Sequence, residues 1–384
     1  MKIATKREKP RAAEATDDDV DNTGAVLHAG EVAQDVTEAM KEGSESSDSE
    51  ESEPEKAYVT SVGNSVSEAS KAAEAAAAKT SDAVRVFEGA ATFGANFRSF
   101  WDRLFFHFSA YDENTTIPAM CYTHDTDAKV RIRDTLQVVS VKVASIKKGL
   151  RWPLQVFGTI SVRDVVDRKR NIIFHRERDT CQTITEQDPY LMLTGPSRAV
   201  VVDYDPSYIE VVLKVKGATK SKDKDLSRLA VAYRLSCLIN GLYPSKLSTL
   251  ELTFSQVYSS VEATVHVKVT GGSWPDGFKG VFSAATVETE CAEVKLLDVG
   301  DDGLPVDAAD GMIRLSRRVV SVELSGMLKV FVSACSADGD EEELCEASFV
   351  PEKAGVSSGI ELKIGSCRME ATVAWSLFKD EYYG

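Results

Sequence analysis

The alternation of apolar and polar residues is clearest between Leu154 and Gly217, and this stretch sets the predicted fold. Ile209, Val211 and Leu213 share one face of its last segment, while Glu210 falls on the other face. This period of two is typical of a half-buried strand. Turns that contain proline separate the segments, and no helical pattern interrupts them. The stretch therefore predicts antiparallel strands joined by short turns.

Similar runs continue on both sides of this stretch. They cover residues 130–145, 226–239, 249–258, 261–270, 278–287, 292–297, 314–324, 327–334 and 368–377. We therefore expect an all-β domain over residues 125–378, built as one antiparallel β-sandwich or as two sandwich-like halves. The segments 261–265 and 369–373 have nearly the same five residues, which suggests a pseudo-repeat of two β halves.

Two segments with helical features precede the β domain and form a predicted region at 64–112. Residues 65–87 are rich in alanine and begin with a Ser and Glu capping pattern, which predicts a short helix. Residues 93–111 are rich in aromatics, and Phe97, Phe100 and Trp101 fall on one helical stripe. A partner-docking helix is one interpretation. We favour a strap that packs across the β domain, because large aromatics usually supply core area.

The beginning of the chain has a different composition. Residues 17–55 are acidic, contribute much of the net charge of −15, and contain almost no large apolar groups, so we expect residues 1–63 to be a disordered acidic tail. No secretory signal or long apolar run is visible, and the seven cysteines are odd in number and widely spaced. These features predict a cytoplasmic chain with reduced thiols. The short basic cluster at 6–11 leaves nuclear entry open.

The best candidate for ligand contact is a basic segment within the central stretch. Its side chains could contact RNA phosphates or a protein partner, and they are Arg163, Arg168, Lys169, Arg170, Arg176 and Arg178. Lysines at 214–224 form a second basic cluster. Acidic residues interleave with the first cluster, so a hairpin with paired surface charges is the favoured explanation.

No motif predicts a metal or another cofactor. Acidic loops at 298–310 and 338–343 could serve Ca²⁺, but their spacing does not match an EF-hand, and solvated turns are favoured. Cys121 and His124 are only half of a zinc site. The serine elbow, the phosphate-binding loop and the His-Glu-x-x-His pair are missing as well. We therefore identify no catalytic residue.

A set of ordered segments carries a resemblance to a known family. Residues 156–163, 167–174, 188–195, 210–217, 315–326 and 369–377 resemble a plant domain family of unknown function that is expanded in cereals. A domain of that family forms the C-terminal part of the cereal jasmonate-induced ribosome-inactivating protein. The resemblance implies no catalytic residues. The Glu and Arg pair of the toxin part is not matched either, because Arg85 stands at the wrong spacing from Glu68 and Glu74.

Together these observations predict a non-enzymatic binding or regulatory module with a protein partner, and the resemblance implies a role in stress or defence. One alternative is an accessory domain that contacts RNA or the ribosome through the basic hairpin. Another is a calcium-dependent, C2-like domain that binds membranes. The first interpretation expects no membrane contact, because an acidic tail disfavours anionic lipid.

Overall fold

The computed structural model describes residues 85–124, 129–147, 149–237, 239–287, 293–336 and 341–379. Contacts divide the chain into Met1–Glu74 and Ala75–Gly384, and every described residue belongs to the second unit. The predicted acidic tail therefore lies outside the described residues. Most of the predicted helix at 65–87 does too, and its described part, residues 85–87, is not helical.

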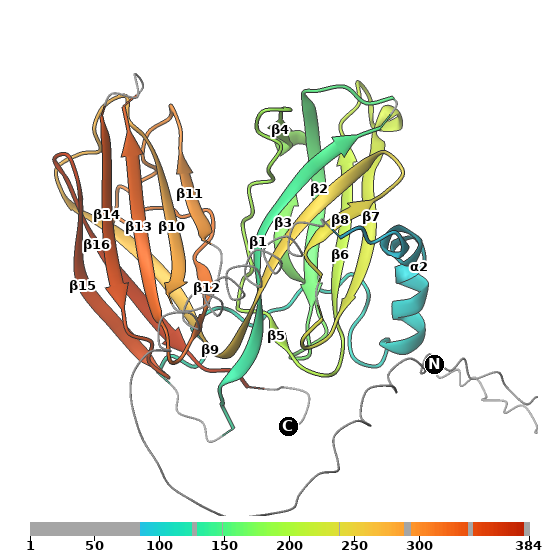
Figure 1. Ribbon diagram of the computed structural model, residues 1–384, viewed down its shortest axis with the longest axis horizontal. Helices are drawn as coiled ribbons and strands as arrows, with labels where there is room; N and C mark the ends of the chain where they lie inside the picture. The colour runs from blue at the N-terminus through green and yellow to red at the C-terminus, as the bar shows by residue number, and fades with distance from the viewer. Residues whose placement is uncertain are drawn as a thin grey trace, which may run out of the picture. The chain divides into compact units, whose positions relative to one another are not determined.

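The described part of the chain forms one α-helix followed by strands (Figure 1), which confirms the predicted all-β class. The elements are α2 (Gly89–Leu104), β1 (Arg133–Ile146), β2 (Leu154–Arg163), β3 (Asn171–Arg176), β4 (Gln182–Ile184), β5 (Val201–Val202), β6 (Ser207–Val215), β7 (Lys224–Tyr233), β8 (Gly241–Pro244), β9 (Ser248–Gly271), β10 (Lys279–Val287), β11 (Val294–Val299), β12 (Val319–Glu323), β13 (Met327–Cys335), β14 (Glu342–Phe349), β15 (Gly355–Ile364) and β16 (Cys367–Ser376).

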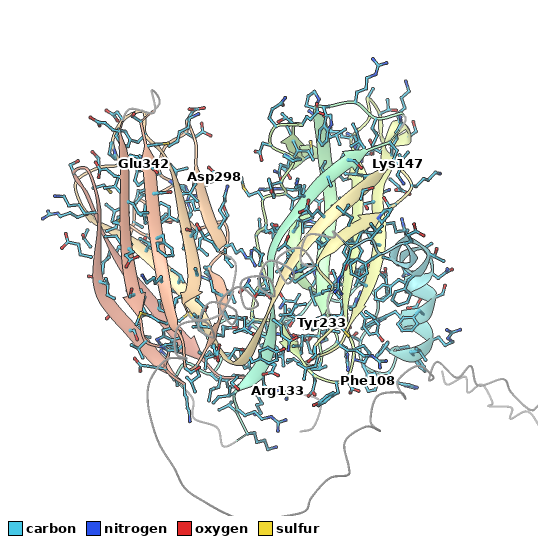
Figure 2. All side chains as sticks on the ribbon, viewed as in Figure 1. Phe108, Arg133, Lys147, Tyr233, Asp298 and Glu342 are labelled. Carbon is cyan, nitrogen blue, oxygen red and sulfur yellow. The ribbon has the colours of Figure 1, made fainter. Side chains whose placement is uncertain are left out.

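The strands build two sandwich lobes around two separate cores. In the first lobe, the sheet β3-β2-β6-β7, with β4 beside β2, packs on β1 and the first half of β9. In the second lobe, the sheet β11-β10-β13-β14 packs on the second half of β9 together with β12, β15 and β16. All of these strand pairs are antiparallel. Figure 2 shows Tyr233 in the first lobe and Glu342 in the second.

Strand β9 belongs to both lobes. Leu250, Leu252 and Phe254 enter the first core, and the second core begins with Val261. The prediction of separate strands at 249–258 and 261–270 was wrong. The predicted break falls at Ser259, which has a positive φ of 44° and follows the exposed Tyr258. The alternation of apolar and polar residues is interrupted there, as it would be at a turn. The strand nevertheless continues, because β1 pairs with its first half and β12 and β16 pair with its second half.

Other predictions about the strands also need correction. The similar segments 261–265 and 369–373 lie side by side on β9 and β16, with Val265 opposite Val373, so they do not mark two repeated halves. The strand expected at 226–239 ends at Tyr233. Strands β14 and β15 were not predicted, because few of their residues are buried and the apolar alternation is weak.

The aromatic strap packs on the first lobe, as expected. Helix α2 buries Phe97 and Trp101 against Tyr208 of β6 and Ala230 of β7. Gly94 permits this approach, since a Cβ at that position would lie 2.6 Å from the backbone of Leu229. The helix thereby covers the sheet beside the candidate basic residues.

Candidate functional site

The predicted basic segment is divided between the interior and the surface of the first lobe. Arg163 at the end of β2 and Arg170 in the following loop both pair with Glu210 of β6, at N–O distances of 3.2 and 2.8 Å. Tyr111 also donates a hydrogen bond to the same carboxylate. The Arg163 guanidinium also lies 4.3 Å from the centre of the Trp101 ring. These contacts tie the strap to the sheet.

The charges in this network support one another. Burial alone would raise the pKa of the Glu210 carboxyl, but Arg170 and Arg163 outweigh that effect and bring its pKa below the usual value. Burial and the neighbouring Glu210 carboxylate raise the pKa of Tyr111 to about 12. The network is therefore an internal, fully partnered cluster at neutral pH.

The remaining predicted contact residues are spread over several surroundings. Arg168 is nearly buried and donates to the Pro206 carbonyl at 2.6 Å. Lys169 lies 3.8 Å from the carboxylate of Glu113, and Arg178 pairs with Asp223 at 2.9 Å. Arg176 lies at the end of β3, with a 3.6 Å contact to the sulfur of Met192. The fold does not bring these cations together as one surface, and their contact with RNA stays a prediction.

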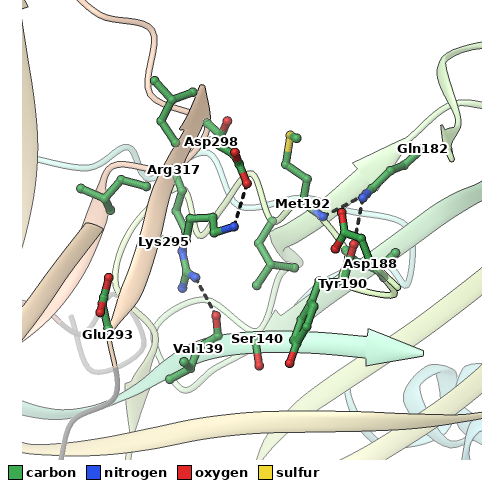
Figure 3. A pocket seen from close by; sticks show the side chains of 15 residues that line it. Val139, Ser140, Gln182, Asp188, Tyr190, Met192, Glu293, Lys295, Asp298 and Arg317 are labelled. Carbon is green, nitrogen blue, oxygen red and sulfur yellow. Dashed lines mark hydrogen bonds and ion pairs between the residues drawn. The ribbon is translucent and has the colours of Figure 1, made fainter. Parts of the chain in front are cut away.

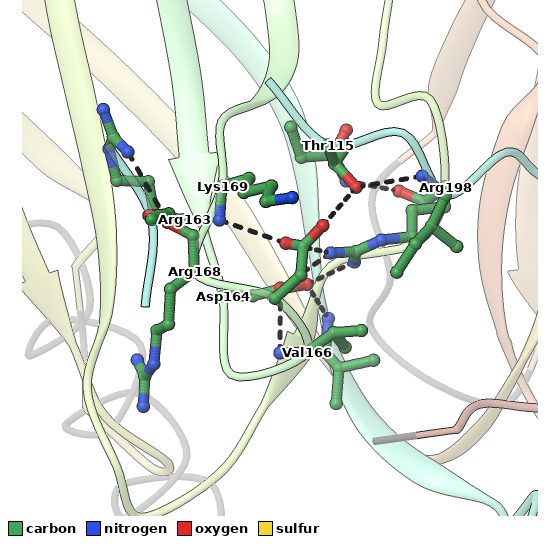
Figure 4. Close-up of polar contacts among 12 residues, drawn as sticks. Thr115, Arg163, Asp164, Val166, Arg168, Lys169 and Arg198 are labelled. Carbon is green, nitrogen blue, oxygen red and sulfur yellow. Dashed lines mark hydrogen bonds and ion pairs between the residues drawn. The ribbon is translucent and has the colours of Figure 1, made fainter. Parts of the chain in front are cut away.

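A second buried network surrounds Arg198, which sequence reasoning did not single out (Figure 4). Its guanidinium donates to Asp164 at 2.5 Å and to Asp167 at 3.1 Å. Burial opposes the charge of Arg198, but the two aspartates outweigh it, so the net pKa is raised. Glu262 lies in the same interior and accepts bonds from the backbone N–H groups of Ala199 and Met120. Although the Nε of Arg198 has no hydrogen-bond partner among the described residues, carboxylates offset its charge.

Arg317 is a buried cation of a different kind. It is only 2% exposed, and its backbone N–H donates to the Leu296 carbonyl at 3.0 Å. Its side chain reaches the carbonyls of Val138 and Val139 on β1, beside a bulge of that strand. No carboxylate of a described residue pairs with it, and its Nε has no hydrogen-bond partner among them. Burial lowers the pKa of Arg317 to about 9, so it stays charged at pH 7.

A cleft of about 310 Å³ lies where the two lobes meet, and Arg317 lines it (Figure 3). One wall comes from β1 and the segment 188–193, and the other from β11 and Ser316. Figure 2 shows Asp298 on the side of the second lobe that faces the first. The apolar part of the lining consists of Val139, Leu191, Met192, Leu193, Leu296 and Leu297. The cleft thus combines an apolar patch and one buried cation with several polar and charged side chains.

The other polar groups of the cleft are engaged with one another or lie at its rim. Lys295 pairs with Asp298 at 2.7 Å. The side-chain amide of Gln182 is bonded to the segment 188–193 on the other wall. It donates to the Tyr190 carbonyl and accepts from the backbone N–H of Met192, both at 2.9 Å. Asp188 and Glu293 are exposed. Sequence reasoning missed this site, since its residues are far apart in the chain and no motif links them.

A shallow basic groove of about 410 Å³ lies at one end of the first lobe. Its lining includes Arg151, Lys216, Lys222 and Lys224, and no carboxylate. Part of the second lysine cluster noted in the sequence therefore forms one surface with Arg151. The acidic loops give no comparable site, because no group of His, Cys, Asp or Glu side chains in the described ranges is arranged to hold a metal ion.

Comparisons with known proteins place the chain in a family without an established function. The chain belongs to the family described as "Domain of unknown function (DUF6598)", which matches residues 135–373. This range includes strands of both lobes and the cleft residues. No curated protein matches the chain.

Solved structures give only distant similarity. Human GIVD cytosolic phospholipase A2 is 7% identical, with a TM-score of 0.21, and the match covers 66% of this chain and 31% of that one. The paired C2 domains of extended-synaptotagmin 2 are 8% identical, also with a TM-score of 0.21, and the match covers 69% of this chain and 100% of that one. In the described part of the chain, no helix has the length and apolar character needed to cross a membrane.

Proposed function

We propose that this chain is a non-enzymatic binding module whose ligand occupies the cleft between the lobes. The observation that carries the proposal is the buried Arg317 at a partly apolar cleft, without a carboxylate partner among the described residues. Binding is favoured over catalysis because an arginine stays protonated and is a poor general base. Lys295 and Asp298 are committed to each other. The expected protein partner and the expected stress or defence role stay predictions.

The test is to fill the cleft and look for lost binding. Met192 lines the cleft and is 41% exposed, whereas Met327 on β13 is 37% exposed and does not line it. Saturation-transfer NMR with a set of small amphipathic molecules would be run on the full chain, on Met192→Trp and on Met327→Trp. We expect a subset of molecules to bind the full chain and Met327→Trp but not Met192→Trp. If no molecule distinguishes the two variants, the cleft is not a ligand site.

The basic groove supports a second candidate function, contact with RNA. Lys222 and Lys224 are exposed there beside Arg151, and none of the described lining residues is acidic. The carboxylate of Asp179 opposes this charge from outside the lining, 3.9 Å from the ammonium group of Lys216. We propose the groove rather than the 163–178 hairpin for this contact, because Arg163 and Arg170 already pair with Glu210.

Charge reversal tests this candidate. The double variant Lys222→Glu/Lys224→Glu would be compared with Lys353→Glu/Lys363→Glu, which changes exposed lysines of the second lobe. Binding to a single-stranded RNA would be measured by fluorescence anisotropy at several salt concentrations. Contact through phosphates predicts a steep fall of affinity with salt and a loss only in the groove variant. Equal behaviour of the two variants would reject the groove.

A further inference from the structure

The charge of Arg317 limits what the cleft can bind. Its guanidinium donates to the carbonyls of Val138 and Val139, but carbonyl dipoles do not neutralise a full positive charge. The Nε–H stays without a partner among the described residues. A ligand with a planar anionic group in the cleft would supply the missing counter-charge, and carboxylates match the donor geometry of arginine best.

The rest of the lining limits the ligand further. Met192, which is 41% exposed, and the small accessible parts of Leu191 and Leu193 offer apolar contact. The volume of about 310 Å³ lies at the lower end of the range for small-molecule sites. The exposed carboxylates of Asp188, Glu293 and Asp298 surround the opening, and Lys295 offsets only one of them. They would repel a strongly charged ligand such as a phosphate dianion, while solvent screens their effect on a single charge.

We propose that the cleft binds a small organic monoanion, a carboxylate with an apolar body, whose carboxylate pairs with Arg317 while the body lies against the leucines. This inference rests on the proposed function, because it specifies the ligand of the same cleft. Arg317 is the residue that determines specificity for the anion, and the apolar lining supplies contact area.

The test compares three probes with the same apolar chain: octanoate, 1-octanol and octylamine. Isothermal titration with the full chain is expected to give an affinity for octanoate about tenfold or more above that for 1-octanol, which is the gain of a hydrogen-bonded charge pair. Octylamine is expected to bind most weakly. Met192→Trp should prevent binding of all the probes, and Met327→Trp should not.

Substitutions of Arg317 then test its role. Arg317→Met should remove the preference for octanoate and leave the affinity for 1-octanol nearly unchanged. Arg317→Lys keeps the charge and should retain part of the preference, which also covers the case in which the methionine variant does not fold. Circular dichroism would check that each variant is folded.

The outcomes separate this inference from the proposed function. If octanoate and 1-octanol bind equally and Met192→Trp blocks both, the cleft is a binding site but the anion inference is overturned. If the preference for octanoate survives in Arg317→Met and in Arg317→Lys without change, another group recognises the anion and the inference is also overturned. If Met192→Trp changes the binding of no probe, both proposals fail.

Discussion

The two buried arginines Arg198 and Arg317 lie in contrasting surroundings. Arg198, 5% exposed, is held between Asp164 and Asp167 inside the first lobe. Arg317, 2% exposed, contacts backbone carbonyls at the cleft, and no described carboxylate pairs with it. A buried ion with hydrogen-bonded partners is explained by the fold itself. A buried ion without a counter-charge at a cleft suggests that a ligand supplies the counter-charge. The absence of a carboxylate partner is therefore a better indicator of a binding site than burial alone.

The largest effect is expected from Arg198→Met. The substitution leaves Asp164 and Asp167 buried without a counter-charge, and breaking such a pair costs about 3–5 kcal/mol of the free energy of unfolding. Urea unfolding would measure it, with Arg228→Met on the exposed face of β7 as control. A loss no larger than that of the control would contradict the view that this network is structural.

Glu210→Gln tests the network of Glu210 with Arg163 and Arg170, and it should lower the free energy of unfolding by less than Arg198→Met does. The amide keeps the size of the side chain but gives up the charged bonds to Arg163 and Arg170, a loss of about 1.5–3 kcal/mol in the free energy of unfolding. Glu346→Gln is the matched control, because Glu346 pairs with Lys329 at the surface. Equal losses in the two variants would show that burial adds nothing to the Glu210 contacts.

The same pair of proteins should differ in their dependence on pH. The pKa of Glu210 is lowered in the folded state, so its contribution is fully present above the pKa of an unfolded glutamate and is lost as the pH falls through the lowered value. The difference in the free energy of unfolding between wild type and Glu210→Gln should therefore be constant near pH 7 and shrink in acid. A difference that grows on acidification would show that the sign is wrong.

The smallest effect is expected from Arg317→Met in the absence of ligand. The substitution removes an unpaired buried charge, which is favourable, and leaves the Val138 and Val139 carbonyls without their donor, which is not. The two changes oppose each other, and we expect the free energy of unfolding to change by about 1 kcal/mol or less. Urea unfolding beside Arg198→Met is the measurement. If Arg317→Met lowered the free energy of unfolding as much as Arg198→Met, the two arginines would not differ in their contribution to stability.

Local sequence patterns were sufficient for many of the elements. The alternation at Ile209, Val211 and Leu213 predicted β6, and all three side chains are buried. The aromatic spacing at Phe97 and Trp101 predicted the strap. Patterns failed where burial is one-sided or weak, as in β14 and β15, and where a strand continues through an exposed position such as Ser259.

The candidate site could not be predicted in the same way. The basic segment at 163–178 was visible because its charges are neighbours in the chain. Its role was not visible, because Glu210, which neutralises Arg163 and Arg170, comes from another strand. Likewise, nothing near Arg317 in the sequence shows that its side chain reaches Val138 of β1.

By itself, the sequence determined the β class, most of the strands and the aromatic strap, because each depends on side chains close together in the chain. Only the tertiary structure decided that β9 is shared by two lobes and which arginines acquire carboxylate partners. It also decided that Arg317 lines a cleft and pairs with no carboxylate of a described residue. The physical reason is that strand pairing and charge pairing join residues far apart in the chain. Their contacts depend on the register and packing of whole sheets, which no local pattern encodes.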